Sequence, residues 1–325
     1  MIAALPAFLH HGAMAAPLLL AGDLGGTKTL LALAEARPEG PVIRREARYA
    51  SREHDRFDTL LADFLAGTPV AAACFGLAGP TDGERAQLTY LPWHLDAGEL
   101  AARHRLGRVL LANDFAAAAH GLDLLGPGGT VTLQAGNPVA DGPRVVLGAG
   151  TGLGVAGLLR REGRTVVVPG EGGHMGFSPQ DGIQLALWQA LHAENGRVTA
   201  EDVVSGPGLA RVHRHLHGLA TTPEAIGAAA LAGDAAARAT VDLWLAAYGA
   251  FAGDVALQWL ARGGVFIAGG IAGKLLPHLP AAPFLAAFNA KREHAGLAAA
   301  MPIRLVTEER LGLLGALALA AAAAG

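Results

Sequence analysis

The chain has 325 residues, of which 52% are hydrophobic and 16% charged, so it can bury a sizeable core and has the length of about two domains. Its 25 basic and 28 acidic residues give a formal net charge of −3 and form no basic stripe, which argues against a nucleic-acid partner. The single cysteine, Cys74, excludes an intrachain disulfide and a zinc site built from paired cysteines. Its apolar neighbours predict a buried side chain.

Neither end of the chain predicts a membrane partner. Residues 1–16 are apolar but lack the positively charged start of a secretory signal peptide, so we interpret them as a disordered extension, with Met14 as an alternative start. The apolar run 311–324 is shorter than the roughly 20 residues of a membrane span and contains two glycines, so we expect a packed, alanine-rich helix. We therefore expect a cytoplasmic protein.

The segment 18–29 is the most informative part of the sequence. An apolar run that predicts a buried strand ends at Asp23, and Gly25-Gly26-Thr27 precede a second apolar run over residues 30–34. Backbone N–H groups in such a glycine turn can hold phosphate, and Asp23 is placed to hold Mg²⁺ through water. An ordinary hairpin turn is the alternative. The sequence G-x-x-x-x-G-K-[ST] of a Walker loop is absent.

Apolar runs that end in glycine or polar residues alternate with helical patterns along the chain, which predicts an α/β protein whose sheets are covered by helices. The further expected strands are 71–77, 109–112, 145–147, 155–159 and 265–268, and the expected helices include 115–124, 184–193 and 235–261. A second glycine-rich loop, residues 148–154, lies between two apolar runs as the first loop does. This weak repeat predicts two related domains, each of which offers a hairpin loop to a shared cleft.

Asn113-Asp114 are the best catalytic candidates, because they end an expected strand and precede a helix. A general base with an orienting amide is the functional interpretation, and such a base typically contributes about 10²–10⁴ in rate. A helix N-cap is the alternative, which the spacing alone favours.

Further candidates lie in three segments, each with an alternative interpretation. Glu171 and His174 stand three residues apart on a glycine-rich loop, where they could bind a polyol, hold a metal or face solvent. Glu201 could bind a ligand or be the first-turn acid of a helix capped by Thr199. The double glycine after the strand 265–268 could approach a flat ligand or form a tight turn. The histidines within 213–217 resemble a solvated helix face.

Taken together, these segments closely resemble the bacterial ATP-dependent glucokinases, a zinc-free branch of the actin-like ATPase and sugar-kinase fold. Six motifs, in the family's order, carry the resemblance: 23–29, 111–115, 148–154, 169–174, 201–208 and 263–271. The resemblance implies two actin-like (ribonuclease H-like) α/β domains with the active site in the cleft between them. The small domain would comprise residues 1–120 with the returning helix 308–325, and the large domain residues 121–307.

The resemblance also implies the function and the role of each site residue. The expected reaction is phosphorylation of D-glucose at its 6-hydroxyl by ATP with Mg²⁺, with Asp114 as the base. Asn113, Asp114, Glu171, His174 and Glu201 would bind glucose, and Asp23 would hold Mg²⁺ through water. The ATP-binding residues would be Asp23, Gly25, Gly26, Thr27, Gly150, Thr151, Gly269, Gly270 and Ile271. We expect glucose and ATP as partners, and a homodimer.

Two departures qualify the resemblance. Related sugar kinases often have an asparagine shortly before the tryptophan that is Trp93 here, but this chain has Tyr90-Leu91-Pro92, so we predict no sugar contact from that segment. The zinc-binding cysteine cluster of the ROK kinases is absent. The alternatives are a kinase for fructose, mannose or an amino sugar, a non-enzymatic sugar-responsive regulator, and an actin-like ATPase.

Overall fold

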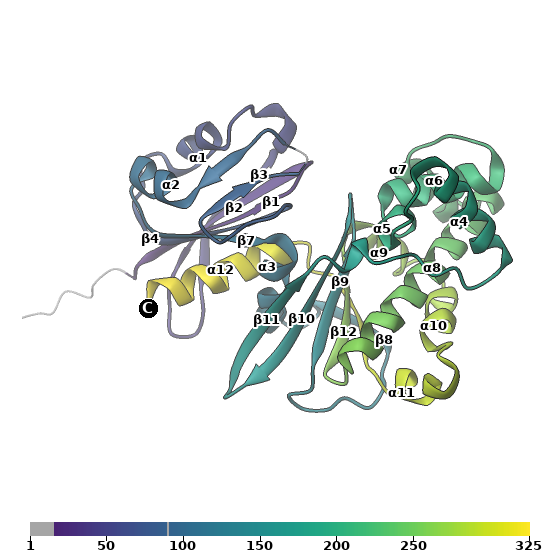
Figure 1. Ribbon diagram of the computed structural model, residues 1–325. Coiled ribbons are helices and arrows are strands. Elements are labelled where there is room, and N and C mark those ends of the chain that lie inside the picture. The colour runs from purple at the N-terminus through teal and green to yellow at the C-terminus, as the bar shows by residue number, and fades with distance from the viewer. Residues whose placement is uncertain (1–15, 90) are drawn as a thin grey trace, which may run out of the picture.

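The computed structural model describes residues 16–89 and 91–325, which form two mixed β-sheets with helices packed on both faces of each (Figure 1). The predicted α/β class is confirmed. The expected extension, residues 1–16, lies almost wholly outside the described residues. Tyr90, in the segment that differs from related sugar kinases, also lies outside them. Within the described ranges, every helix is too short or too polar to span a bilayer.

The first sheet has the strand order β3-β2-β1-β4-β7. Its strands are β1 (Leu18–Leu24), β2 (Lys28–Glu35), β3 (Val42–Ala50), β4 (Val70–Leu77) and β7 (Leu106–Asn113). β1 pairs antiparallel with β2 and parallel with β4, so its apolar run lies at the centre of the sheet. A small ribbon of β5 (Arg85–Gln87) and β6 (His94–Asp96) lies outside the sheet.

Helices cover the two faces of the first sheet with different parts of the chain. On one face, α1 (Phe57–Leu65) and α2 (Ala97–His104), which follows β6, enclose a core that includes Phe75. On the other face, α12 (Leu311–Ala324) packs Leu313 and Leu317 against β1 and β4. Cys74 is buried on this second face, as the sequence predicts. The last helix of the chain therefore completes the core of its first sheet (Figure 1).

The second sheet, β11-β10-β9-β12-β13-β8, repeats the plan of the first. Its strands are β8 (Thr130–Gln134), β9 (Arg144–Ala149), β10 (Leu153–Arg161), β11 (Arg164–Gly170), β12 (Gly264–Ala268) and β13 (Ile303–Val306). As in the first sheet, an antiparallel meander (β9, β10 and β11) continues into parallel strands (β12 and β13). The shared topology accounts for the weak internal repeat in the sequence.

Eight of the described helices contribute to the core on one face of the second sheet. They are α4 (Gly182–Asn195), α5 (Ala200–Val203), α6 (Gly206–His217), α7 (Pro223–Leu231), α8 (Ala235–Trp259), α9 (Gly270–Leu275), α10 (Ala282–Asn289) and α11 (Ala295–Ala299). Short 3₁₀ turns are η1 (Ser51–Glu53), η2 (Leu122–Leu124), η3 (Gly172–His174) and η4 (Arg292–His294). The long helix α8 packs on this face and contributes many of the buried side chains of the core.

Helix α3 (Asp114–Gly121) packs between the two sheets (Figure 1). It contacts β4 and β7 of the first sheet, β9, β10 and β11 of the second, and α12. Alanines 118 and 119 belong to the core on the face of the second sheet that α8 does not cover. Because α3 contacts both sheets, the domain limits near residue 120 stay a prediction.

The structure corrects one expectation about the histidines of α6. The alternating pattern predicts a solvated face, but His213 is only 7% exposed, and its Nδ1 lies 2.9 Å from Oγ1 of Thr240 on α8. His213 and His217 are one helical turn apart and therefore share a face, which here packs on α8. Buried histidine at this interface is stabilised by its hydrogen bond, which the residue pattern alone does not reveal.

Candidate functional site

Asn113 and Asp114 lie where β7 ends and α3 begins. The side chain of Asn113 is the N-cap, and its Oδ1 accepts hydrogen bonds from the backbone N–H groups of Phe115 (3.0 Å) and Ala116 (3.1 Å). Asp114 is the first residue of the helix, and its Oδ1 also accepts from the Phe115 N–H at 2.9 Å. The capping interpretation therefore holds for Asn113, and it leaves the amide NH₂ of that residue to donate elsewhere.

The carboxyl of Asp114 is partly buried and has an unusual electrostatic environment. Desolvation, followed by the negative charge of Asp23 and, to a lesser degree, that of Glu171, raises the pKa of Asp114 to about 7. The Phe115 N–H opposes this rise. A carboxyl whose pKa lies near neutral pH is a stronger base than an ordinary aspartate and is still partly ionised at pH 7, which is what a general base requires.

Asp23 ends the apolar part of β1, on the strand beside β4. Burial raises the pKa of its carboxyl, and the positive charge of Lys28 partly opposes that rise. The first turn of α12 lies against it, because a Cβ built on Gly312 would come 2.9 Å from Oδ2 of Asp23. Asp23 and Glu171, from two other elements, thus both lie within electrostatic reach of the Asp114 carboxyl.

These carboxylates fit a hydrated cation that is shared with a phosphate ligand. Asp23 and Asp114 repel one another, and a divalent cation beside Asp23 would relieve that repulsion. Among residues 16–89 and 91–325, however, no group of three or more His, Cys, Asp or Glu side chains could hold a metal alone. Mg²⁺ is typically held by one or two carboxylates with water and phosphate oxygens, so this donor set suits it.

The first glycine loop joins β1 to β2 and is braced by residues from η1. The N–H of Gly25 donates to the Lys28 carbonyl at 3.0 Å, and Oγ of Ser51 donates to the Gly25 carbonyl at 2.7 Å. Ser51 is buried and also lies 2.9 Å from Oγ1 of Thr29. Thr27 at the tip is exposed. Ser51, which the sequence analysis missed, is distant in the chain, and no local pattern identifies it.

The second glycine loop joins β9 to β10, and two of its glycines accommodate an aromatic ring. The ring of Phe115 lies against Gly154, where a Cβ would overlap Cδ2, and it also lies 2.7 Å from the position of a Cβ on Gly148. Gly150 is different, because nothing lies within 4 Å of its Cβ position. Thr151 is exposed at the tip. Gly148 and Gly154 therefore serve packing, while Gly150 and Thr151 are open to a ligand.

Glu171 and His174 lie on a tight turn at the end of β11. The N–H of His174 donates to the Glu171 carbonyl at 3.0 Å, and both side chains are exposed. The two intervening glycines let this turn press against β10, since a Cβ on Gly172 would lie 2.8 Å from Cγ2 of Val155. The turn thus holds Glu171 at the edge of the second sheet, facing the charge of Asp114.

Glu201, on helix α5, also contacts strand β10. It lies in the first turn of α5, which is capped by Thr199 as predicted, in a capping box with Asp202. Its Oε2 accepts a hydrogen bond from the Leu153 N–H at 2.8 Å, at the start of β10. Glu171, His174 and Glu201 therefore gather around the first residues of β10, although the sequence places Glu201 far from the other two.

Gly269, Gly270 and Ile271 form the turn from β12 into α9. Gly269 has φ of 89°, and a Cβ there would lie 2.5 Å from the Ala149 carbonyl oxygen, so only glycine fits this turn. Nothing lies within 4 Å of the Cβ position of Gly270. The N–H of Gly206 donates to the Gly150 carbonyl at 2.8 Å, and Cδ1 of Ile271 lies 3.6 Å from the Gly206 Cβ position. The second loop and this turn are thus neighbours.

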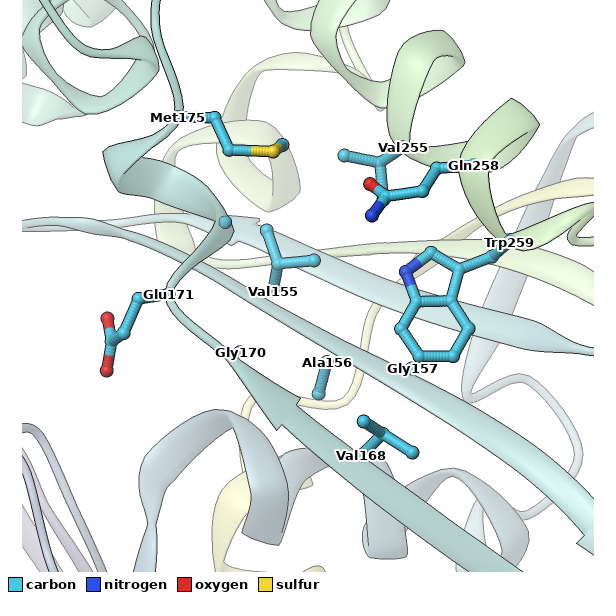
Figure 2. A pocket seen from close by; sticks show the side chains of 11 residues that line it. Val155, Ala156, Gly157, Val168, Gly170, Glu171, Met175, Val255, Gln258 and Trp259 are labelled. Carbon is cyan, nitrogen blue, oxygen red and sulfur yellow. The ribbon is translucent and has the colours of Figure 1, made fainter.

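A separate pocket of about 250 Å³ lies on the α8 side of β10 and β11 (Figure 2). Its lining is largely apolar and includes Val155, Val168, Met175 and Trp259. Figure 2 shows that the carboxylate of Glu171 points away from these side chains. Besides Glu171, its lining offers the amide of Gln258 but no charged side chain, so it suits a sugar or phosphate ligand poorly, and the candidate site lies on the other side of Glu171.

Comparison with known proteins places this arrangement in context. Residues 20–323 match the family model described as Glucokinase. A curated glucokinase from Nostoc sp. is 36% identical over 333 residues, which covers 92% of this chain and 97% of that protein. The crystal structure of a glucokinase from an Antarctic psychrotroph superposes with a TM-score of 0.81 and 28% identity, covering 94% of this chain and 98% of the other. The glucokinase from Balamuthia mandrillaris, solved in complex with glucose, shares the fold, with a TM-score of 0.78 and 22% identity over 94% of this chain and 93% of its own.

Proposed function

This chain belongs to the glucokinase family, and from that premise we propose that it transfers the terminal phosphate of ATP to the 6-hydroxyl of D-glucose, with Asp114 as the general base. The observation that carries the assignment of Asp114 is its pKa of about 7, raised by burial and by two neighbouring carboxylates. An ordinary surface aspartate would be a much weaker base. Its position at the start of α3, between the two sheets, suits a group that acts on a substrate held by both.

Glucose is proposed to bind through Asn113, Asp114, Glu171, His174 and Glu201. Asn113 uses its Oδ1 to cap α3, so its amide NH₂ is the group available to a sugar hydroxyl. Oε2 of Glu201 is engaged by the Leu153 N–H, which leaves Oε1 to accept from the sugar. The side chains of Asn113, Asp114 and Glu201 accept hydrogen bonds from backbone N–H groups, so their positions are set before the sugar arrives.

ATP is proposed to bind through the two glycine loops and the β12–α9 turn. Gly25, Gly26, Thr27, Gly150 and Thr151 would hold the phosphates, and the open space at Gly150 supports that role. Gly269, Gly270 and Ile271 would contact the adenosine. Asp23 would hold Mg²⁺ through water, and bound Mg²⁺ would neutralise the charge on the phosphates.

The organisation of the chain is part of this proposal. We propose a small domain of residues 1–120 with 308–325 and a large domain of residues 121–307, with the reaction between them. The packing of α12 on the first sheet supports the assignment of the last segment. A homodimer and a cytoplasmic location remain predictions.

The experiment that tests the function is ADP production by the purified full chain with glucose, mannose, fructose and N-acetylglucosamine at equal concentrations. The proposal expects sugar-dependent turnover with the highest kcat/KM for glucose. Because a buried polar group left unpaired by a wrong epimer costs about 1–3 kcal/mol, we expect roughly 10- to 100-fold discrimination against mannose. A higher kcat/KM for another hexose would assign the same site to that sugar, and ATP turnover without sugar would contradict the proposal.

A further inference from the structure

The C-terminal helix meets Asp23 at a residue that has no side chain. Gly312 is the second residue of α12, and a Cβ built on it would lie 2.9 Å from Oδ2, 3.0 Å from Cγ and 3.3 Å from Oδ1 of Asp23. Real Cβ atoms essentially never come within 3.0 Å of another heavy atom. The carboxyl of Asp23 therefore occupies the space that any other amino acid at position 312 would fill.

Glycine is otherwise a poor choice for this position. It is an unfavourable helix former, and the rest of α12 is rich in alanine and leucine, which favour the helix. Its conformation in the helix is one that every amino acid adopts, since it is absent from the residues with positive φ. The close approach of Asp23 is thus the feature of the structure that explains a glycine here.

Helix α12 and strand β1, which carries Asp23, are both held in place and cannot move apart. Leu313 and Leu317 are buried against β1 and β4, and a Cβ on Gly315 would overlap the Ala117 carbonyl of α3. Asp23 lies in β1, which is hydrogen-bonded on both sides. An added methyl group at position 312 would therefore be relieved by rotation of the short Asp23 side chain, which changes where its oxygens point.

We propose that Gly312 is a positioning residue for phosphoryl transfer. Because Gly312 has no side chain, the Asp23 carboxylate keeps the orientation in which it would hold the hydrated Mg²⁺ of the nucleotide. This inference rests on the proposed role of Asp23. It assigns a task in the reaction to a helix that lies at the far end of the sequence and contributes no side chain to it.

The first test is the Mg²⁺ dependence of glucose phosphorylation by Gly312→Ala. We expect the Mg²⁺ concentration for half-maximal rate at fixed ATP to rise by about fivefold or more, with the KM for glucose changed less than about twofold. The matched control is Gly296→Ala, because Gly296 is also the second residue of a helix and has nothing within 4 Å of its Cβ position. A Mg²⁺ dependence of Gly312→Ala equal to that of the control would overturn the proposal.

The second test needs no activity and works even if Gly312→Ala folds poorly. Thermal unfolding of the metal-free protein is measured for Gly312→Ala, Asp23→Ala and the double variant. We expect Gly312→Ala to raise Tm in the Asp23→Ala background, where the space is free and alanine favours the helix, and to raise it by at least about 2 °C less, or to lower it, when Asp23 is present. Recovery of folding in the double variant would count as the same result.

The outcomes separate this inference from the proposed function. Equal effects of Gly312→Ala in both backgrounds, or a double variant that fails to fold when Asp23→Ala folds, would overturn the contact itself. If the stability cycle shows the coupling while the wild-type chain does not phosphorylate any hexose, the contact stands and the role in phosphoryl transfer is rejected along with the function.

Discussion

The ring of Phe115 lies directly against the backbone of Gly154, so that the residue after the proposed base is fixed to the second glycine loop. The same ring approaches Gly148 on the neighbouring strand. Phe115 belongs to α3, and both glycines belong to the β9–β10 hairpin, so the contact couples the start of α3 to the second sheet.

Gly154→Ala should therefore impair both folding and catalysis. The added methyl group overlaps the Phe115 ring, and overpacking of this kind costs about 1–3 kcal/mol. Urea unfolding and kcat measure the two effects, and Gly182→Ala, at an open position in the first turn of α4, is the control. Replacement of Phe115 by leucine in the Gly154→Ala background should restore part of the stability, and a lack of any recovery would argue against this contact as the cause.

Asp114→Asn should lower kcat by at least about 10² and change the glucose KM by only a small factor, because the amide keeps the shape but accepts no proton. Steady-state kinetics with glucose and ATP measure both constants. Asp63→Asn, on the exposed face of α1, should leave them unchanged. Near-normal turnover by Asp114→Asn would remove Asp114 from the mechanism.

The pH profile should report the ionisation of the base. With a pKa of about 7 for Asp114, the ionised form that accepts a proton is lost as pH falls through neutrality. We expect kcat/KM for glucose to be constant above about pH 8 and to fall about tenfold per unit below pH 6. A rate that stays constant down to pH 5 would be incompatible with this pKa.

The same carboxyl should make the protein less stable in alkaline buffer. The folded-state pKa of Asp114 is about 7 and its model value is 3.8, so between these limits the folded state keeps a proton that the unfolded state has lost. This contribution to stability disappears as pH rises through 7, and a shift of this size corresponds to an upper bound of roughly 4 kcal/mol. Asp114→Asn has no carboxyl at this position and therefore does not lose this stability as pH rises. Its Tm should therefore exceed the wild-type Tm by more at pH 8 than at pH 5, and an equal difference at both would refute the linkage.

Glu201→Ala should weaken the binding of both glucose and ATP. It removes a proposed sugar ligand, and it also leaves without a partner the N–H of Leu153, which belongs to the second glycine loop that is proposed to bind ATP. The loss of such a hydrogen bond costs about 1–3 kcal/mol, which corresponds to roughly 10- to 100-fold in KM. Glu201→Gln keeps an acceptor for Leu153, so its KM for ATP should stay closer to the wild type than that of Glu201→Ala. Glu224→Ala, an exposed first-turn acid of α7, is the matched control.

The sequence predicts those parts of the fold that depend on local pattern. The apolar runs that become β1, β4, β9 and β12 are continuous because both faces of these strands are buried. The apolar run 311–324 has the limits of α12, whereas the helix 308–325 that the resemblance implies begins three residues too early, because residues 309–310 form a turn before the helix. The N-cap interpretation of Asn113 is confirmed, since capping is decided within four residues of chain.

The contacts between distant segments could not be predicted in the same way. Ser51 braces the first loop across 26 residues, and Glu201 reaches Leu153 across 48. Gly154 appears in the sequence as one more phosphate-loop glycine, and only the position of Phe115 shows that it serves packing. The prediction of a solvated face is wrong for His213, because an alternating polar pattern does not show that α8 packs over it.

The position of α12 has a consequence for how the chain acquires its structure during synthesis. One face of β1 and β4, with Leu19, Ala21 and Cys74, stays uncovered until Leu313 and Leu317 leave the ribosome, about 240 residues after Cys74 and almost 300 residues after Leu19. At about 5–20 residues per second, the apolar face of the two strands waits for roughly 12 to 50 seconds before its covering helix exists. The first-made sheet is therefore the last to be finished, and throughout that interval its open face is a natural binding surface for a chaperone.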